Sequence, residues 1–181
     1  MQVKIGMNML LWGIQITPKH IPVFAGLAAA GYDGVEIPVI GQSTAELKTM
    51  AAACDDLGLA RTAVAFVGEH VNPISPSPAI RIAAVDSLKK GIDDAKLIGA
   101  DILGGGIYQA HKYFTGRGPT QDEWDWSADY LRTCGEYAQQ AARGRACRGH
   151  YDQQQPDHEP GQIAPQAAHG TRLDRRKGHR G

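Results

Sequence analysis

The stretch GYDGVEIPV, residues 31–39, decides how this chain folds. Gly31 follows an alanine-rich helix, where glycine best tolerates the left-handed backbone of a helix end. The apolar run at 35–39 lies between turn residues and predicts a buried strand. Glu36 places a carboxylate inside that strand, and burying a charge is costly unless the charge is paired or used. The carboxylate therefore either pairs with a neighbouring Lys or Arg in the core or faces a functional site.

The same alternation of apolar strand and amphipathic helix occurs four times along residues 3–142. Strands are predicted at 3–11, 35–39 and 63–67, with a fourth beginning at 101–103. Helices follow each strand, and two of them begin with a capping box, Ser43–Glu46 and Thr120–Glu123. The spacing in the last helix predicts an inward face made of Trp124, Ala128, Leu131, Gly135 and Ala138.

Four strand–helix repeats with buried strands indicate an α/β fold with a parallel sheet and right-handed crossovers. The pattern fits half of an eight-stranded barrel, and it equally fits part of a doubly wound open sheet. The triple glycine at 104–106 matches neither the dinucleotide nor the P-loop fingerprint. It predicts instead a close approach of the backbone to a ligand or to a neighbouring strand.

The charges balance over the whole chain, with 19 Lys and Arg against 19 Asp and Glu among 181 residues. Residues 1–142 hold 11 basic and 15 acidic residues, and residues 143–181 hold 8 and 4. The acidic composition of residues 1–142 indicates that the chain does not bind nucleic acid. The apolar run at 7–12 is too short to span a membrane. Three cysteines without metal-ligand spacing or an even disulfide count fit a reducing cytoplasm.

The pattern of strands and helices stops inside the fourth helix. Residues 143–181 are rich in Arg, Gly, Gln and His, and Ile163 and Leu173 are their only large aliphatic residues. Such a composition buries too little apolar surface to offset the entropy of ordering the chain. We therefore expect residues 143–181 to be disordered and to be an out-of-frame translation, with a genuine basic tail as the alternative.

Several segments resemble the sugar phosphate isomerase/epimerase family, the xylose isomerase-like TIM barrels of the D-tagatose 3-epimerase type. GYDGVEIPV resembles the second-strand signature of that family. Residues 72–101, NPISPSPAIRIAAVDSLKKGIDDAKLIGAD, are similar to its third helix and the approach to its fourth strand. Gly106-Ile-Tyr108 followed by KYFTGRGPTQDEW, residues 112–124, resembles its fourth loop and helix. The resemblance covers residues 3–142 and implies the first four βα units of a (β/α)8 TIM barrel, a half-barrel.

The resemblance implies a sugar or sugar phosphate substrate and proton transfer next to a ketose carbonyl, assisted by a divalent Mn, Mg or Co ion. In the family the metal ligands and catalytic glutamates come from strands five to eight. Nothing in this chain resembles those strands, so no catalytic residue and no metal ligand is assigned here.

The resemblance does imply the first half of a substrate rim, because TIM barrels carry function at the carboxyl ends of their strands. Trp12 either stacks on a sugar or packs in the core, and the two histidines are expected in exposed loops. The candidate substrate-binding residues are Asn8, Trp12, Glu36, His70, Tyr108 and His111.

Three functions follow as hypotheses. The first is a metal-dependent ketose epimerase or isomerase by family, and the second is an apurinic-site endonuclease of the same barrel type, which would need a basic DNA-binding face. The third, which we favour for the chain as written, is a truncated and inactive half-barrel. Four strands leave the inner face open, so Val and Ile are expected to meet water, and the free sheet edges offer a route to self-association.

Overall fold

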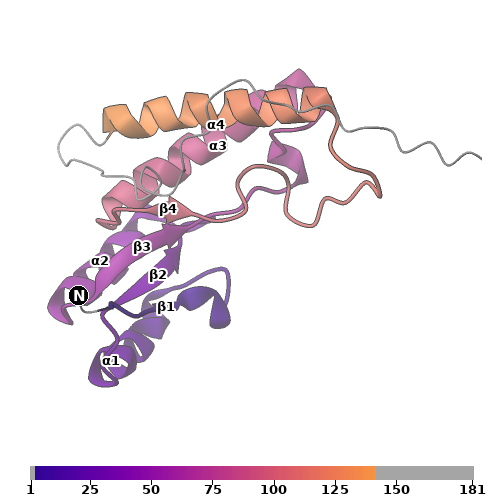
Figure 1. Ribbon diagram of the computed structural model, residues 1–181. Helices are drawn as coiled ribbons and strands as arrows, with labels where there is room; N and C mark the ends of the chain where they lie inside the picture. The colour runs from indigo at the N-terminus through magenta and orange to yellow at the C-terminus, as the bar shows by residue number, and fades with distance from the viewer. Residues whose placement is uncertain (1–2, 142–181) are drawn as a thin grey trace, which may run out of the picture. The chain divides into compact units, whose positions relative to one another are not determined.

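Four short parallel strands form one sheet in the order β1-β2-β3-β4 (Figure 1). The computed structural model describes residues 3–141. The strand bounds are β1 Gly6–Asn8, β2 Gly34–Pro38, β3 Ala60–Val64 and β4 Leu103–Gly104. The helix bounds are α1 Ile21–Ala29, α2 Thr44–Asp56, α3 Pro78–Leu97 and α4 Gln121–Ala141. The predicted repeats of strand and helix are confirmed as an α/β half-barrel.

The first strand is shorter than its apolar run predicts. After β1, residues Met9–Leu11 form a 3-10 turn. The side chain of Asn8 causes this change, because its Oδ1 accepts a hydrogen bond from the backbone N–H of Leu10 at 2.8 Å. A side chain that bonds to nearby backbone competes with a strand and favours a turn.

Both predicted capping boxes are present. The Ser43 N–H donates to the Glu46 carboxylate at 3.1 Å, and the Glu46 N–H donates to Ser43 Oγ at 3.2 Å. At α4 the Thr120 N–H donates to Glu123 at 2.7 Å, and the Glu123 N–H donates to Thr120 Oγ1 at 3.2 Å. These bonds satisfy backbone donors that the first helical turn leaves unpaired.

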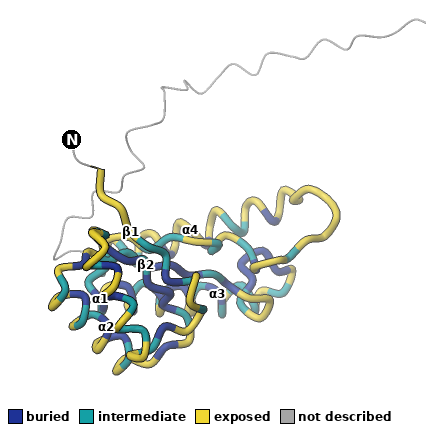
Figure 2. Tube along the Cα trace, turned by 90° about the horizontal axis from the view of Figure 1, so that it is seen from below, coloured by how far each residue is buried: buried dark blue, intermediate teal, exposed yellow. Residues whose placement is uncertain are grey.

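The main core lies between the sheet and the first helices (Figure 2). Phe24 of α1 and Met50 of α2 are fully buried there against Ile37 of β2. A second cluster joins α3 to α4 and consists of Ala84, Leu88, Tyr130 and Cys134. None of the helices within residues 3–141 is long and apolar enough to cross a membrane.

The inward face predicted for α4 is wrong. Trp124 is 63% exposed and Leu131 is 38% exposed, whereas Tyr130 and Cys134 are buried against α3. Successive residues of a helix are 100° apart, so the side that contacts α3 lies about a quarter turn from the predicted stripe. Trp126, in contrast, packs against α3, with the Arg81 guanidinium 4.2 Å from its ring centre.

The open face of the sheet is more polar than its apolar strands suggest. Asn8, Glu36 and Thr62 lie side by side in the register of β1, β2 and β3. Val35 and Ile37 point the other way and are buried in the core, because side chains alternate along a strand. The expectation that Val and Ile meet water is therefore wrong for β2, although Ile102 beside β4 is 56% exposed.

Candidate functional site

Asn8, the last residue of β1, and Glu36, the middle residue of β2, form a polar pair across the two strands. The expectation that Glu36 lies at the carboxyl end of its strand is therefore wrong, because β2 continues to Pro38. The Asn8 amide Nδ2 donates a hydrogen bond to Glu36 Oε2. The Asn8 Oδ1 is held by the backbone of Leu10, so both polar atoms of this amide have partners. Within residues 3–141 no Lys or Arg forms an ion pair with Glu36. The second alternative for this carboxylate, a group that faces a site, therefore agrees better with the structure.

The pair borders a shallow depression of about 370 Å³ on the sheet. Its polar lining consists of one amide, one hydroxyl, two carboxylates and two cationic side chains, from Asn8, Thr62, Asp33, Glu36, Lys4 and Arg61. Such a group of donors and acceptors suits hydroxyl groups of a small polar ligand. Its lining comprises Lys4, Ile5, Gly6, Met7, Asn8, Asp33, Gly34, Val35, Glu36, Ala60, Arg61 and Thr62.

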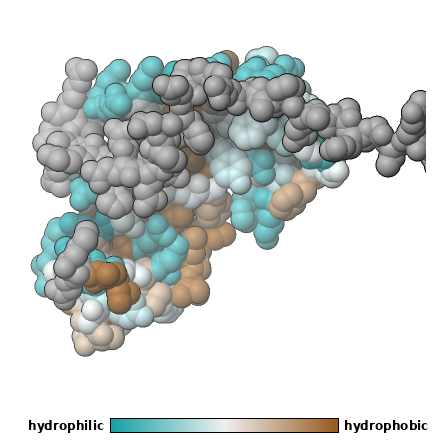
Figure 3. Space-filling model, in the orientation of Figure 1, coloured by the Kyte–Doolittle hydropathy of each residue, from teal (hydrophilic) through white to brown (hydrophobic). Residues whose placement is uncertain are grey.

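The segment after β1 carries large apolar side chains into solvent. Leu11 is 75% exposed, Trp12 is 41% exposed and Ile14 is 51% exposed. Figure 3 shows hydrophobic surface gathered over this segment. Trp12 is therefore not a core residue, and part of its ring is free for stacking on a sugar.

The loops after β3 and β4 are joined through a buried asparagine. Asn72 is 4% exposed, and its Oδ1 accepts hydrogen bonds from the backbone N–H groups of Ile74 at 3.3 Å and Ala110 at 3.1 Å. The His111 N–H also donates to the Val67 carbonyl at 2.7 Å. These bonds hold the two histidine-bearing loops side by side.

Both candidate histidines are exposed, as expected. His70 lies in the 3-10 turn Glu69–Val71, and the His111 ring lies 5.3 Å from the Phe66 ring, centre to centre. Tyr108 is 55% exposed, and its carbonyl accepts a hydrogen bond from Ser127 Oγ of α4 at 3.0 Å. The structure thus brings Asn8 to Glu36 and the loop of His70 to the loop of His111. Among residues 3–141, no hydrogen bond links these two pairs.

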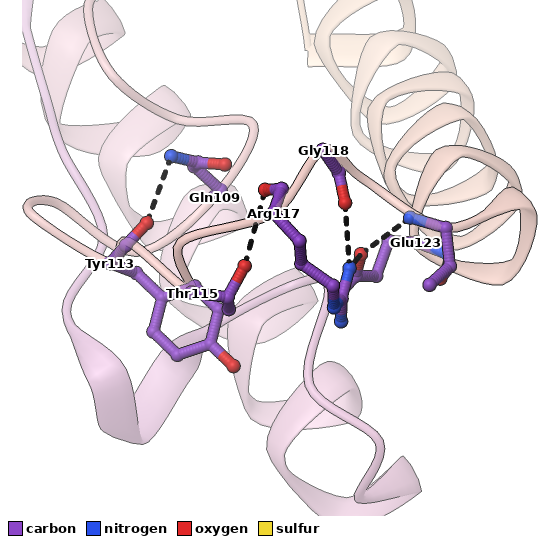
Figure 4. Close-up of polar contacts among 7 residues, drawn as sticks. Gln109, Tyr113, Thr115, Arg117, Gly118 and Glu123 are labelled. Atoms are coloured by element: carbon purple, nitrogen blue, oxygen red, sulfur yellow. Dashed lines mark hydrogen bonds and ion pairs between the residues drawn. The ribbon is translucent and has the colours of Figure 1, made fainter.

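Arg117 anchors the long loop between β4 and α4, and the sequence analysis missed it (Figure 4). Its guanidinium forms two parallel hydrogen bonds with the Glu123 carboxylate, at 2.8 and 2.9 Å. These bonds, and the Thr120 N–H, lower the pKa of Glu123 to about 2. The same carboxylate raises the pKa of Arg117. The capping box at Thr120–Glu123 could have pointed to Arg117, because a buried capping carboxylate needs a cationic partner nearby.

The described residues do not fit the divalent metal site that the resemblance implies. Within residues 3–141, no three His, Cys, Asp or Glu side chains come together in a group that would hold a metal ion. The oxygen ligands around the depression are the carboxylates of Asp33 and Glu36, one amide and one hydroxyl, and Asp33 already accepts the Ile5 N–H. This set falls short of the carboxylate-rich shells of Mg²⁺ and related ions. No step of a reaction is therefore derived through a metal here.

The chain matches one family and several solved structures. The family model of the xylose isomerase-like TIM barrel matches residues 24–143. The D-allulose 3-epimerase from Methylomonas sp., solved in complex with D-allulose, is 23% identical with a TM-score of 0.67, covering 76% of this chain and 48% of that chain. The D-psicose 3-epimerase from Clostridium cellulolyticum H10, solved with D-tagatose, is 19% identical with a TM-score of 0.67, covering 76% and 49%.

An L-ribulose 3-epimerase is similar to the same degree, at 22% identity and a TM-score of 0.67, covering 77% of this chain and 47% of that chain. This chain therefore spans about half the length of the solved structures that it matches. At these identities the likeness shows a shared fold. No curated protein sequence matches the chain.

Proposed function

Because this chain belongs to the xylose isomerase-like TIM barrel family, we propose that its described residues form the sugar-binding half of an isomerase or epimerase site. The hydrogen-bonded pair of Asn8 and Glu36 carries the proposal. Asn8 is the last residue of β1, and barrels of this type place functional groups at the carboxyl ends of their strands. Glu36 lies opposite Asn8, in the middle of β2.

The chemistry of these residues supports a sugar as the ligand. Glu36 retains acceptor positions beyond the one used by Asn8, because an ionised carboxylate accepts several hydrogen bonds. Sugar hydroxyls donate such bonds. Trp12 and Tyr108 are 41% and 55% exposed, so each offers part of an aromatic face to the apolar side of a sugar ring. The proposed roles are hydroxyl binding for Asn8 and Glu36 and stacking for Trp12 and Tyr108.

Binding without turnover is the activity we propose for the chain as written. Epimerisation next to a carbonyl requires a positioned base and a positioned acid on the two faces of the same carbon. Glu36 is one carboxylate held by a neutral amide, and we assign it to binding and not to proton transfer. His70 and His111 flank the rim from the loops after β3 and β4 and receive no catalytic role.

Ligand-observed NMR with D-fructose and D-tagatose tests the binding role. We expect saturation transfer from the chain to the sugar, strongly reduced by Trp12→Ala and by Glu36→Gln. Ile82→Ala is the matched control, because Ile82 is a 65% exposed apolar residue on α3 with no place in the rim. The absence of transfer to a chain that circular dichroism shows to be folded would refute sugar binding. Turnover of either ketose with added Mn²⁺ would refute the assignment of binding alone.

A further inference from the structure

Two apolar surfaces lack partners within residues 3–141, and the first lies at the β1 edge of the sheet. Val3 is 80% exposed and Ile5 is 59% exposed. Side chains alternate along an extended chain, so both lie on the same side as Met7, which packs against the core beneath the helices. This side of the sheet is the one that helices cover elsewhere.

The second surface is a stripe along α4 formed by Trp124, Ala128, Leu131 and Gly135. These residues are spaced four, three and four apart and therefore share one side of the helix. Trp124 is 63% exposed and Leu131 is 38% exposed, because α3 contacts the neighbouring side of the helix. Isolated exposed apolar residues are ordinary, but a stripe of this length indicates a contact surface.

We propose that the α4 stripe of one copy of this chain packs over Val3 and Ile5 of a second copy, with β4 of the first copy pairing in parallel with β1 of the second. One chain cannot make this contact by itself, because β2 and β3 separate β1 from β4 (Figure 1). Two copies related by a two-fold axis make it twice and close an eight-stranded ring without free edges.

The helices that would become neighbours are complementary in size and charge. Residues Ile21–Ala29 of α1 contain no charged residue, and the exposed side of this helix carries the small residues Ala25, Gly26 and Ala29. A helix that is apolar all round is normally buried. The large Trp124 and Leu131 of α4 fit such a surface.

Charged residues of opposite sign would lie next to each other in the same arrangement. Helices that follow parallel strands run in the same direction, so the first turns of α4 and of the second copy's α1 would lie together. Asp122 and Asp125 are exposed near the start of α4, and Lys19 is exposed just before α1.

The remaining residues, 143–181, contain eight Lys and Arg and only two large aliphatic residues, a composition that offers no apolar cover for the α4 stripe.

Light scattering coupled to size-exclusion chromatography of the full chain tests the proposal. The expected mass is twice the 19.4 kDa of one chain. Ile5→Lys and Leu131→Lys should each weaken dimerisation by about a hundredfold or more, because each buries an unpaired charge at both contacts. Ile82→Lys is the matched control at 65% exposure on α3 and should leave the dimer intact.

Mixing the Ile5→Lys and Leu131→Lys chains gives a sharper test. The mixed pair contains one contact with both original surfaces, so it should dimerise more tightly than either variant alone. Circular dichroism checks that each variant is folded, and Val3→Lys, at an 80% exposed position, replaces Ile5→Lys if that chain is not. A monomeric original chain, open polymers that grow with concentration, or a dimer indifferent to both lysines would overturn the proposal.

Discussion

Replacing Gly105 by alanine should damage the fold far more than the same change one residue earlier. Gly105 has a φ of +120°, and a Cβ built on it would lie 2.1 Å from the carbonyl oxygen of Ala65. A Cβ on Gly104 meets no atom within 4 Å. The triple glycine therefore allows a close approach to a neighbouring strand, as the sequence predicted, and Gly105 is the residue that makes it.

Two terms set the expected size of the effect. A non-glycine residue held in this sparsely populated backbone region costs about 1–3 kcal/mol. Forcing a methyl group into a filled space costs about 1–3 kcal/mol more. Ala65 donates its N–H to the Gly104 carbonyl at 2.9 Å, so a shift that relieves the clash weakens the β3–β4 pairing. We expect a loss of about 2–6 kcal/mol for Gly105→Ala and less than about 1 kcal/mol for Gly104→Ala.

Urea unfolding followed by circular dichroism measures both variants against the original chain. The free energy of unfolding should fall only for Gly105→Ala, and a chain too unstable to fold would be the extreme of the same result. Equal free energies of unfolding for the two variants would refute the reasoning, because the variants differ in backbone angle and in the distance to Ala65.

Two further predictions concern the loops. Asn72→Ala removes the acceptor of the Ile74 and Ala110 N–H groups and should lower the free energy of unfolding by about 2–4 kcal/mol, with faster hydrogen exchange at Ala110 than at other loop amides. Unchanged exchange there would contradict it. The pKa of Glu123 is lowered from 4.5 to about 2, mainly by Arg117, so the stability it contributes is present above pH 4.5 and lost as the pH falls toward 2. The urea midpoint of Arg117→Met should fall less over that range, and identical pH profiles would contradict this.

Much of the local structure was predictable because it depends on neighbours in the sequence. The capping boxes at Ser43–Glu46 and Thr120–Glu123 join residues three apart. The joint at residues 31–39 also forms as predicted, with Gly31 at a φ of +88° between α1 and β2. Four such units in succession favour a parallel sheet whatever the rest of the chain does.

The candidate site was predictable only as a set of strand ends. The sequence placed Asn8 and Glu36 on two predicted strands, but their hydrogen bond joins residues 28 positions apart and depends on the register of β1 and β2. Asn72 was not singled out at all, since its role is to join two loops 38 positions apart. Contacts at such separations carry no periodic signal along the chain.

The sequence by itself determined the order of strands and helices, the starts of α2 and α4 and the family, because spacing over a few residues encodes them. Only the tertiary structure decided which side of α4 is buried. Trp124 and Leu131 have the apolar spacing of a core face, yet α3 packs against Tyr130 and Cys134 on the neighbouring side. Spacing shows that a helix has an apolar side, but the position of its neighbour decides which side loses contact with water.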